Sequence, residues 1–95
     1  MRAACRFEVF GRVQGVGFRF FVWRRAEALG LDGWVRNRAD GAVEVLAAGE
    51  AEQLEQLRAQ LAAGPRWSRV DRVEVSEEEP EALEPSTGFD VRRDR

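Results

Sequence analysis

The chain has 95 residues, 44% of them hydrophobic, which predicts a single domain spanning residues 1–95 around one modest core. Its formal net charge of −2 excludes a general binder of nucleic acid or of anionic membranes, because such proteins need a basic surface. All 15 basic residues are arginines, and the absence of lysine, histidine and tyrosine excludes an imidazole base, a Schiff-base lysine and a serine–histidine pair.

The first part of the chain predicts a strand, a helix and a second strand. Apolar and polar residues alternate from 5 to 13, as in a half-buried strand, and only Phe10 breaks the pattern on the polar face. The segment 11–19, which holds three glycines, leads into the helix. Residues 19–29 have the apolar spacing of an amphipathic helix that ends at a glycine. Residues 31–38 follow as the second strand.

The second part predicts a hairpin turn, a strand, a helix with leucines along one side, and two further strands. These elements are expected at Asp40-Gly41, 42–48, 50–63, 70–75 and around 89–91. The acidic run 77–80 is interpreted as a solvated loop between the last two strands. No internal repeat and no linker divides the chain.

This order of elements, β-α-β-β-α-β plus a short terminal strand, predicts a ferredoxin-like α+β sandwich. Two strands joined through a helix prefer to lie parallel in one sheet with a right-handed crossover. In the split arrangement another strand inserts between them, so the sheet is mainly antiparallel and two helices cover one face. Many unrelated functions use this fold, so function has to be argued from the site.

The glycine-rich segment has the composition of a site for an anion. Gly11, Gly15 and Gly17 allow consecutive backbone N–H groups to turn toward one point. The helix that follows adds unpaired N–H donors and a partial positive charge. Arg19 adds a planar set of donors that suits a phosphate or a carboxylate. The segment matches neither the dinucleotide-binding spacing nor the P-loop.

Asn37 is the second candidate residue, because it ends the second strand. The carboxyl ends of the first and second strands fall on the same edge of the sheet if the strands are parallel. With one strand between them, these ends lie roughly 10 Å apart, a gap that a long arginine and a bound phosphate can fill. Alternation places Asn37 on the same face as Val35, which we expect to be the face that the helices cover.

Motifs along the whole chain resemble those of the acylphosphatase family in type, order and spacing. The matching segments are Gly11-Arg12-Val13-Gln14-Gly15-Val16-Gly17-Phe18-Arg19, Leu29-Gly30-Leu31, Gly33-Trp34-Val35-Arg36-Asn37, Asp40-Gly41 and Gly88-Phe89. The core Gly15-Val16-Gly17-Phe18-Arg19 and the separation between Arg19 and Asn37 are the diagnostic parts.

The resemblance implies hydrolysis of acyl phosphates to a carboxylate and inorganic phosphate. It implies that Arg19 binds the phosphoryl group and that Asn37 positions the attacking water. It also implies that backbone N–H groups of the loop complete the phosphate site, here those of Arg12, Val13, Gln14, Gly15 and Val16. No metal or organic cofactor is required. The expected partner is a small-molecule acyl phosphate, with no nucleic acid and no membrane, and the protein is expected to be a monomer.

Two other functions stay open at this stage. One is a non-catalytic or partner-dependent acylphosphatase-like domain, as at the N-terminus of large carbamoyl-transfer proteins that mature hydrogenases. The end of the chain soon after its last strand favours a stand-alone enzyme. The other is a ferredoxin-like RNA-binding module, which needs aromatic residues on the open face of the sheet. The first strand offers Phe10 there, but the basic surface and the expected aromatic-rich motif are missing.

The remaining residues near the motif have ordinary structural interpretations. Phe20, Phe21 and Trp23 are interpreted as packing residues in preference to a base-stacking platform, and Arg24 and Arg25 as solvated charges. Cys5 is interpreted as a small core residue, since a lone cysteine forms no internal disulfide. Metal sites built on clusters of histidine or cysteine are excluded. With no apolar run of membrane-spanning length and no signal peptide before the first strand, we expect a cytoplasmic protein.

Overall fold

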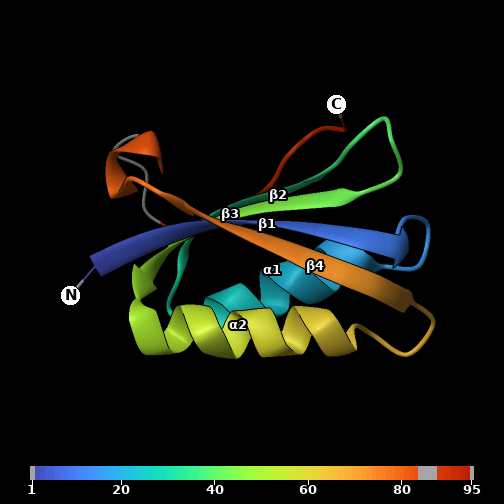
Figure 1. The fold of residues 1–95 in the computed structure, drawn as a ribbon, viewed down its shortest axis with the longest axis horizontal. Coiled ribbons are helices and arrows are strands. Elements are labelled where there is room, and N and C mark those ends of the chain that lie inside the picture. The colour runs from blue at the N-terminus through green and yellow to red at the C-terminus, as the bar shows by residue number, and fades with distance from the viewer. Residues whose placement is uncertain (1, 84–87, 95) are drawn as a thin grey trace.

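The computed structural model describes residues 2–83 and 88–94, which form one five-stranded sheet and two α-helices. Both helices lie on the same face of the sheet (Figure 1). The elements are β1 (Arg2–Arg12), α1 (Phe18–Ala28), β2 (Asp32–Asn37), β3 (Val43–Glu50), α2 (Ala51–Ala63), β4 (Arg69–Glu78), the short 3₁₀ helix η1 (Pro80–Leu83) and β5 (Phe89–Val91). No helix in the described ranges is long and apolar enough to cross a bilayer.

The strand order is β4-β1-β3-β2-β5, which confirms the predicted ferredoxin-like arrangement. β3 lies between β1 and β2 and pairs antiparallel with both, so β1 and β2 run parallel to each other. β5 pairs parallel with β2 at the far edge, and β4 pairs antiparallel with β1 at the other edge. The sheet is therefore mixed but mainly antiparallel, and the ends of β1 and β2 lie on one side of the molecule.

The core lies between the sheet and the two helices. α1 contributes Phe18, Val22 and Ala26, and α2 contributes the leucine stripe that the sequence predicts. The strands contribute alternate residues from their helix-covered side, such as Val9 and Val35. Burial of these apolar surfaces is the main force that holds the helices on the sheet. The buried leucines of α2 are Leu54, Leu57 and Leu61.

The opposite face of the sheet carries ion pairs in place of a second layer. Glu44 of β3 is buried and accepts hydrogen bonds from Arg6 of β1 and from Arg36 of β2. The distance from Arg36 Nε to Glu44 Oε1 is 2.8 Å. Arg38 pairs with Glu8 and with Asp40, and these hydrogen bonds raise the pKa of Arg38 above its ordinary value, the bond to Asp40 most. The open face is thus held together by side chains that cross from strand to strand.

One prediction is wrong, and another holds only in part. The acidic run was expected to form a loop, but Glu77 and Glu78 are the last residues of β4 and pair with β1. Glu78 also accepts a hydrogen bond of 3.2 Å from Arg6. An edge strand tolerates such charge, because its outer edge reaches water and Glu77 is exposed. Phe20 was expected to be a packing residue, and its ring does stack against Trp23, but the residue is 59% exposed.

Candidate active site

The sheet register places Asn37 on the helix-covered face, at the end of β2. Asn37 pairs with Val43 of β3, and Val43 pairs with Val9 of β1, so the three residues form one row across the sheet. Val9 and Val43 both belong to the core on the helix side. β1 continues beyond this row to Arg12 before the chain turns into the glycine loop. The loop therefore begins two strands away from Asn37, as the sequence predicts.

The side chain of Gln14 fastens the loop to the turn between β2 and β3. Its Nε2 donates to the carbonyl of Arg38 at 2.8 Å and to that of Ala42 at 2.9 Å. The turn itself is closed by a hydrogen bond from the Ala42 N–H to the Asp40 carboxylate. Sequence reasoning assigned only a backbone role to Gln14, and nothing in the local pattern shows that its side chain crosses to this turn. The result is a loop held against the end of β2.

Gly15 and Gly17 shape the loop and open the start of α1. Both have positive φ angles, 75° and 78°, which other residues rarely adopt. Gly17 is the residue before the helix, and no side chain caps the helix start. Among the described residues, the N–H groups from Gln14 to Phe20 donate to no protein acceptor, and the first is that of Phe21, to the Gly17 carbonyl. These N–H groups are therefore free to donate to a bound anion.

A pocket of about 310 Å³ lies where the loop, the start of α1 and the end of β2 meet. Arg19 and Asn37 both line it. Asn37 is only 6% exposed, and its Oδ1 has no hydrogen-bond partner among the described residues. A buried carbonyl oxygen without a partner is costly, and such atoms commonly mark functional sites. The lining residues are Val13, Gly15, Gly17, Phe18, Arg19, Phe20, Asn37 and Val91.

Arg19 carries positive charge at a helix end that is already positive. The first turn of α1 holds no acidic residue that offsets its guanidinium. Arg19 is partly exposed, and its Nη1 donates to the carboxylate of Asp94 at 2.8 Å. This contact shows an anionic oxygen at the guanidinium in a geometry that a phosphate oxygen can also adopt.

The structure brings together only part of the set that the sequence predicts. Arg19, Asn37, Val13 and Gly15 line the pocket, whereas Arg12, Gln14 and Val16 do not. Sequence reasoning missed Gly17, Phe18, Phe20 and Val91 as lining residues. The first three follow from the helix start, since the residues that open a helix surround its free N–H groups. Val91 has no signal in the sequence, because only the pairing of β5 with β2 brings it to this edge.

The comparisons with known proteins agree with this geometry. The acylphosphatase family model matches residues 5–91. The chain belongs to the acylphosphatase family. A curated acylphosphatase of Koribacter versatilis is 62% identical over 76 residues, which are 80% of this chain and 69% of the relative. The crystal structure of the Bacillus subtilis acylphosphatase superposes with a TM-score of 0.88 at 40% identity, covering 97% of this chain and 99% of that chain.

A larger protein contains a domain with the same fold. Full-length HypF, in a phosphate- and nucleotide-bound crystal structure, matches with a TM-score of 0.87 at 28% identity. The match covers 99% of this chain but 12% of that one. The activity of the acylphosphatase family is the hydrolysis of acyl phosphates, and the resemblance first drawn from the loop motif is confirmed at the level of family and fold.

In this acylphosphatase, β5 is held beside the pocket by contacts from two elements, β2 and α1. The Asp32 carboxylate accepts from the Gly88 N–H at 2.7 Å, and the Trp23 indole donates to the Phe89 carbonyl at 3.0 Å. The hydrogen bond from Gly88, followed by that from Arg2, holds the pKa of Asp32 below its ordinary value. Val91 is thereby fixed at the pocket wall.

The open face gives no support to the RNA-binding alternative. Arg72 lies over the Phe10 ring at 3.9 Å, and the guanidiniums of Arg36 and Arg92 lie over the Trp34 ring at 4.5 and 5.0 Å. Arginine therefore occupies the faces on which bases would stack. Within residues 2–83 and 88–94, no group of three or more acidic or cysteine side chains is placed to hold a metal ion.

Proposed function

We propose that this acylphosphatase hydrolyses acyl phosphates by direct attack of one positioned water. Arg19 and the free N–H groups of the loop and helix start bind the phosphoryl oxygens. Asn37 orients the water. We propose in addition that the protein needs no metal and works as a monomer with a single domain over residues 1–95. The lone reduced Cys5 is consistent with the cytoplasm.

One observation carries the proposal: Arg19, the open helix start and Asn37, whose buried Oδ1 has no partner among the described residues, line the same pocket. Oδ1 can accept a hydrogen bond from a water that stands in line with the scissile bond. The guanidinium and the N–H groups supply positive charge on the other side. Neither group is a strong base, so the pocket is built to hold reactants rather than to remove a proton.

An acyl phosphate suits such a site because its carboxylate is a good leaving group. The water oxygen forms a bond to phosphorus while the bond from phosphorus to the acyl oxygen breaks and its electrons leave with the carboxylate. The proton of the water passes to a phosphate oxygen of the substrate. Fixed donors that match the developing charge are worth about 10²–10³ in rate each. With no histidine in the chain, kcat should be nearly flat from mildly acidic to neutral pH.

Release of inorganic phosphate from benzoyl phosphate tests the proposal. We expect the purified protein to release phosphate far faster than buffer, with inorganic phosphate as a competitive inhibitor. The Asn37→Ala variant should lose most of kcat while its circular dichroism spectrum stays that of the folded protein. Hydrolysis no faster than in buffer, or a limb in the pH profile near the ordinary histidine pKa, would contradict it.

The similarity to a domain of HypF makes a partner-dependent, non-catalytic domain the second function to be tested. A partner-dependent domain would bind phosphate in the same pocket but would not turn over benzoyl phosphate by itself. Phosphate binding measured by calorimetry, together with absent hydrolysis, would therefore favour that function. Binding and hydrolysis together favour the stand-alone enzyme.

A further inference from the structure

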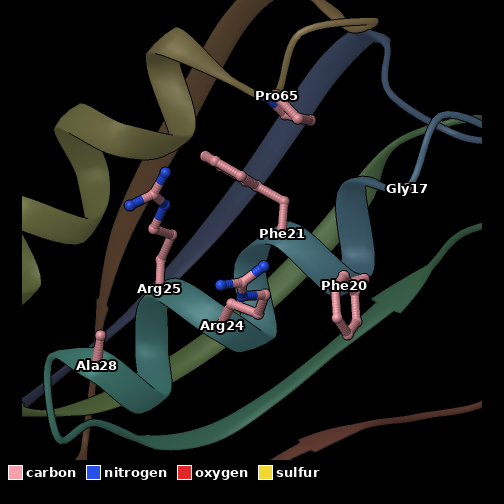
Figure 2. Close-up of a pocket in the computed structure, with 7 residues that line it drawn as sticks. All are labelled: Gly17, Phe20, Phe21, Arg24, Arg25, Ala28 and Pro65. Atoms are coloured by element: carbon pink, nitrogen blue, oxygen red, sulfur yellow. The ribbon is translucent and has the colours of Figure 1, made fainter.

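A second groove runs along α1 from the edge of the phosphate pocket. It has a volume of about 370 Å³ and lies between the helix and the turn at Pro65. Figure 2 shows Gly17 at its beginning and Ala28 near its end, with side chains of α1 between them. The lining residues are Gly17, Phe20, Phe21, Arg24, Arg25, Ala28 and Pro65.

The groove and the phosphate pocket share Gly17 and Phe20 as lining residues. A side chain placed at Gly17 would meet no atom within 4 Å, so the route between the two cavities passes over open space. Phe20 is largely exposed and presents its ring at this junction. A molecule whose phosphoryl group lies at Arg19 can therefore extend its other end past Gly17 and Phe20 into the groove.

The groove carries positive charge that the protein itself does not neutralise. Neither Arg24 nor Arg25 has a carboxylate partner in the part of the chain that the structure describes. Their guanidiniums lie over aromatic rings instead, Arg24 at 5.8 Å from Phe20 and Arg25 at 5.1 Å from Phe21. Such stacking leaves the in-plane N–H donors of a guanidinium available to an acceptor.

We propose that this groove binds the acyl part of the substrate, and that Arg24 favours acyl phosphates whose acyl group carries a second, anionic group. This inference rests on the proposed function. Arg24 is the specificity-determining residue because it stands one helical turn after Phe20, on the same side of α1. Arg19 and Arg24 are five residues apart, which separates them by about 7.5 Å along the helix axis and by about 140° around it. A substrate therefore reaches Arg24 from the phosphate pocket by way of Gly17 and Phe20, the residues that line both cavities.

The test uses two rigid substrates that differ in charge, 4-carboxybenzoyl phosphate and its neutral analogue 4-carbamoylbenzoyl phosphate. The para position prevents the carboxylate from attacking its own acyl group. The measured quantity is the ratio of kcat/KM for the anionic substrate to kcat/KM for the neutral one. Comparing this ratio between variants cancels the intrinsic difference in reactivity between the two substrates.

We expect Arg24→Gln to lower this ratio about threefold to fivefold at low salt, the upper part of the range for a solvent-accessible charge pair. Arg24→Glu should lower it further, and Arg24→Lys should retain most of it. The difference between wild type and Arg24→Gln should shrink in high salt. The matched control is Arg72→Gln, which removes the same charge from the open face and should leave the ratio unchanged.

An unchanged ratio in both Arg24→Gln and Arg24→Glu would overturn the inference. So would an equal fall in Arg72→Gln, because it would show general attraction by net charge instead of recognition in the groove. Failure of the proposed function looks different, since neither substrate would then be hydrolysed faster than in buffer. If Arg24→Glu is folded, hydrolyses the neutral substrate as fast as the wild type and leaves the ratio unaltered, the proposed function stands and only the role of the groove is contradicted.

Discussion

Arginine has different surroundings on the open face of the sheet and along α1. On the open face, Arg6 and Arg36 both reach Glu44, which is buried on the strand between them, and Arg38 reaches Glu8 of β1 from the turn after β2. On α1, among the described residues, Arg19 at the helix start pairs only with Asp94 of the C-terminal segment, and Arg24 pairs with no carboxylate. The same residue type therefore joins strands in one region and remains available to a ligand in the other.

The difference follows from geometry. In a sheet, residues on neighbouring strands face one another in register, so an arginine opposite a glutamate has its partner built in. At a helix start, the backbone already presents positive charge, and the glycine loop offers no side chain that could neutralise it. The second region is electrostatically incomplete without an anion. Five substitutions test this contrast, in order of expected effect.

Loss of the Arg19 guanidinium should have the largest effect on activity. We expect Arg19→Ala to lower kcat/KM on benzoyl phosphate by about 10²–10³, because a charged donor to the phosphoryl group is removed. Arg72→Ala, on the open face, should leave kcat/KM within about twofold. Steady-state phosphate release measures both. Equal losses in the two variants would remove the distinction between the regions.

Loss of the Glu44 charge should have the largest effect on stability. We expect Glu44→Gln to lower the free energy of unfolding by about 3 kcal/mol, because it leaves two guanidiniums beside a buried neutral amide. Urea unfolding followed by circular dichroism measures this. The kcat of the folded fraction should stay near that of the wild type, since the open face takes no part in the reaction. A strong fall in kcat at full folding would contradict this.

Removal of the Gln14 side chain should affect both properties moderately. Gln14→Ala loses two hydrogen bonds to the turn between β2 and β3, and we expect a loss of about 1–2 kcal/mol in stability. The loop then loses its fixed position relative to Asn37, and kcat/KM should fall about tenfold. Thermal unfolding and phosphate release measure the two effects. The exposed Gln56→Ala serves as the control and should change neither.

The Asp32 carboxylate should give a small, acid-dependent contribution to stability. Its pKa is lowered in the folded protein, chiefly by the Gly88 N–H, so the stabilisation is present above about pH 4, the ordinary aspartate range, and is lost as the pH falls through the folded pKa. We expect less than about 1 kcal/mol, because the group is near the surface. The difference in unfolding free energy between wild type and Asp32→Asn should therefore shrink as the pH is lowered. A difference that stays constant with pH would contradict the contribution of the Asp32 carboxylate.

The contact between Asp94 and Arg19 should give the smallest effect. Both side chains are substantially exposed, so the pair is weak. In Asp94→Asn the competing negative charge is gone, and we expect the inhibition constant of inorganic phosphate to fall about twofold. An inhibition constant that rises instead would mean that Asp94 holds Arg19 in its binding position and does not compete with the anion.

The local sequence pattern predicted most of the fold, because the periodicity of apolar residues and the choice of turn residues depend on only a few neighbouring positions. The alternation in β1, the leucines of α2 and the Asp40-Gly41 turn each gave the correct element. The pattern failed for Glu77 and Glu78. The backbone groups of β1 pair with this acidic segment and make it part of an edge strand. The pattern held only in part for Phe20, because helical spacing alone does not show which aromatic residue lies over a pocket.

By itself, the sequence indicated the family and the ferredoxin-like fold. Through the family resemblance it also indicated the two residues that we assign to phosphate and water, Arg19 and Asn37. The resemblance follows from the motif around Arg19 and from the separation between Arg19 and Asn37. Only the tertiary structure decided that Gln14 fastens the loop, that Val91 completes the pocket and that the groove with Arg24 joins it. Those contacts join segments far apart in the chain, and their side-chain directions depend on packing that no local pattern encodes.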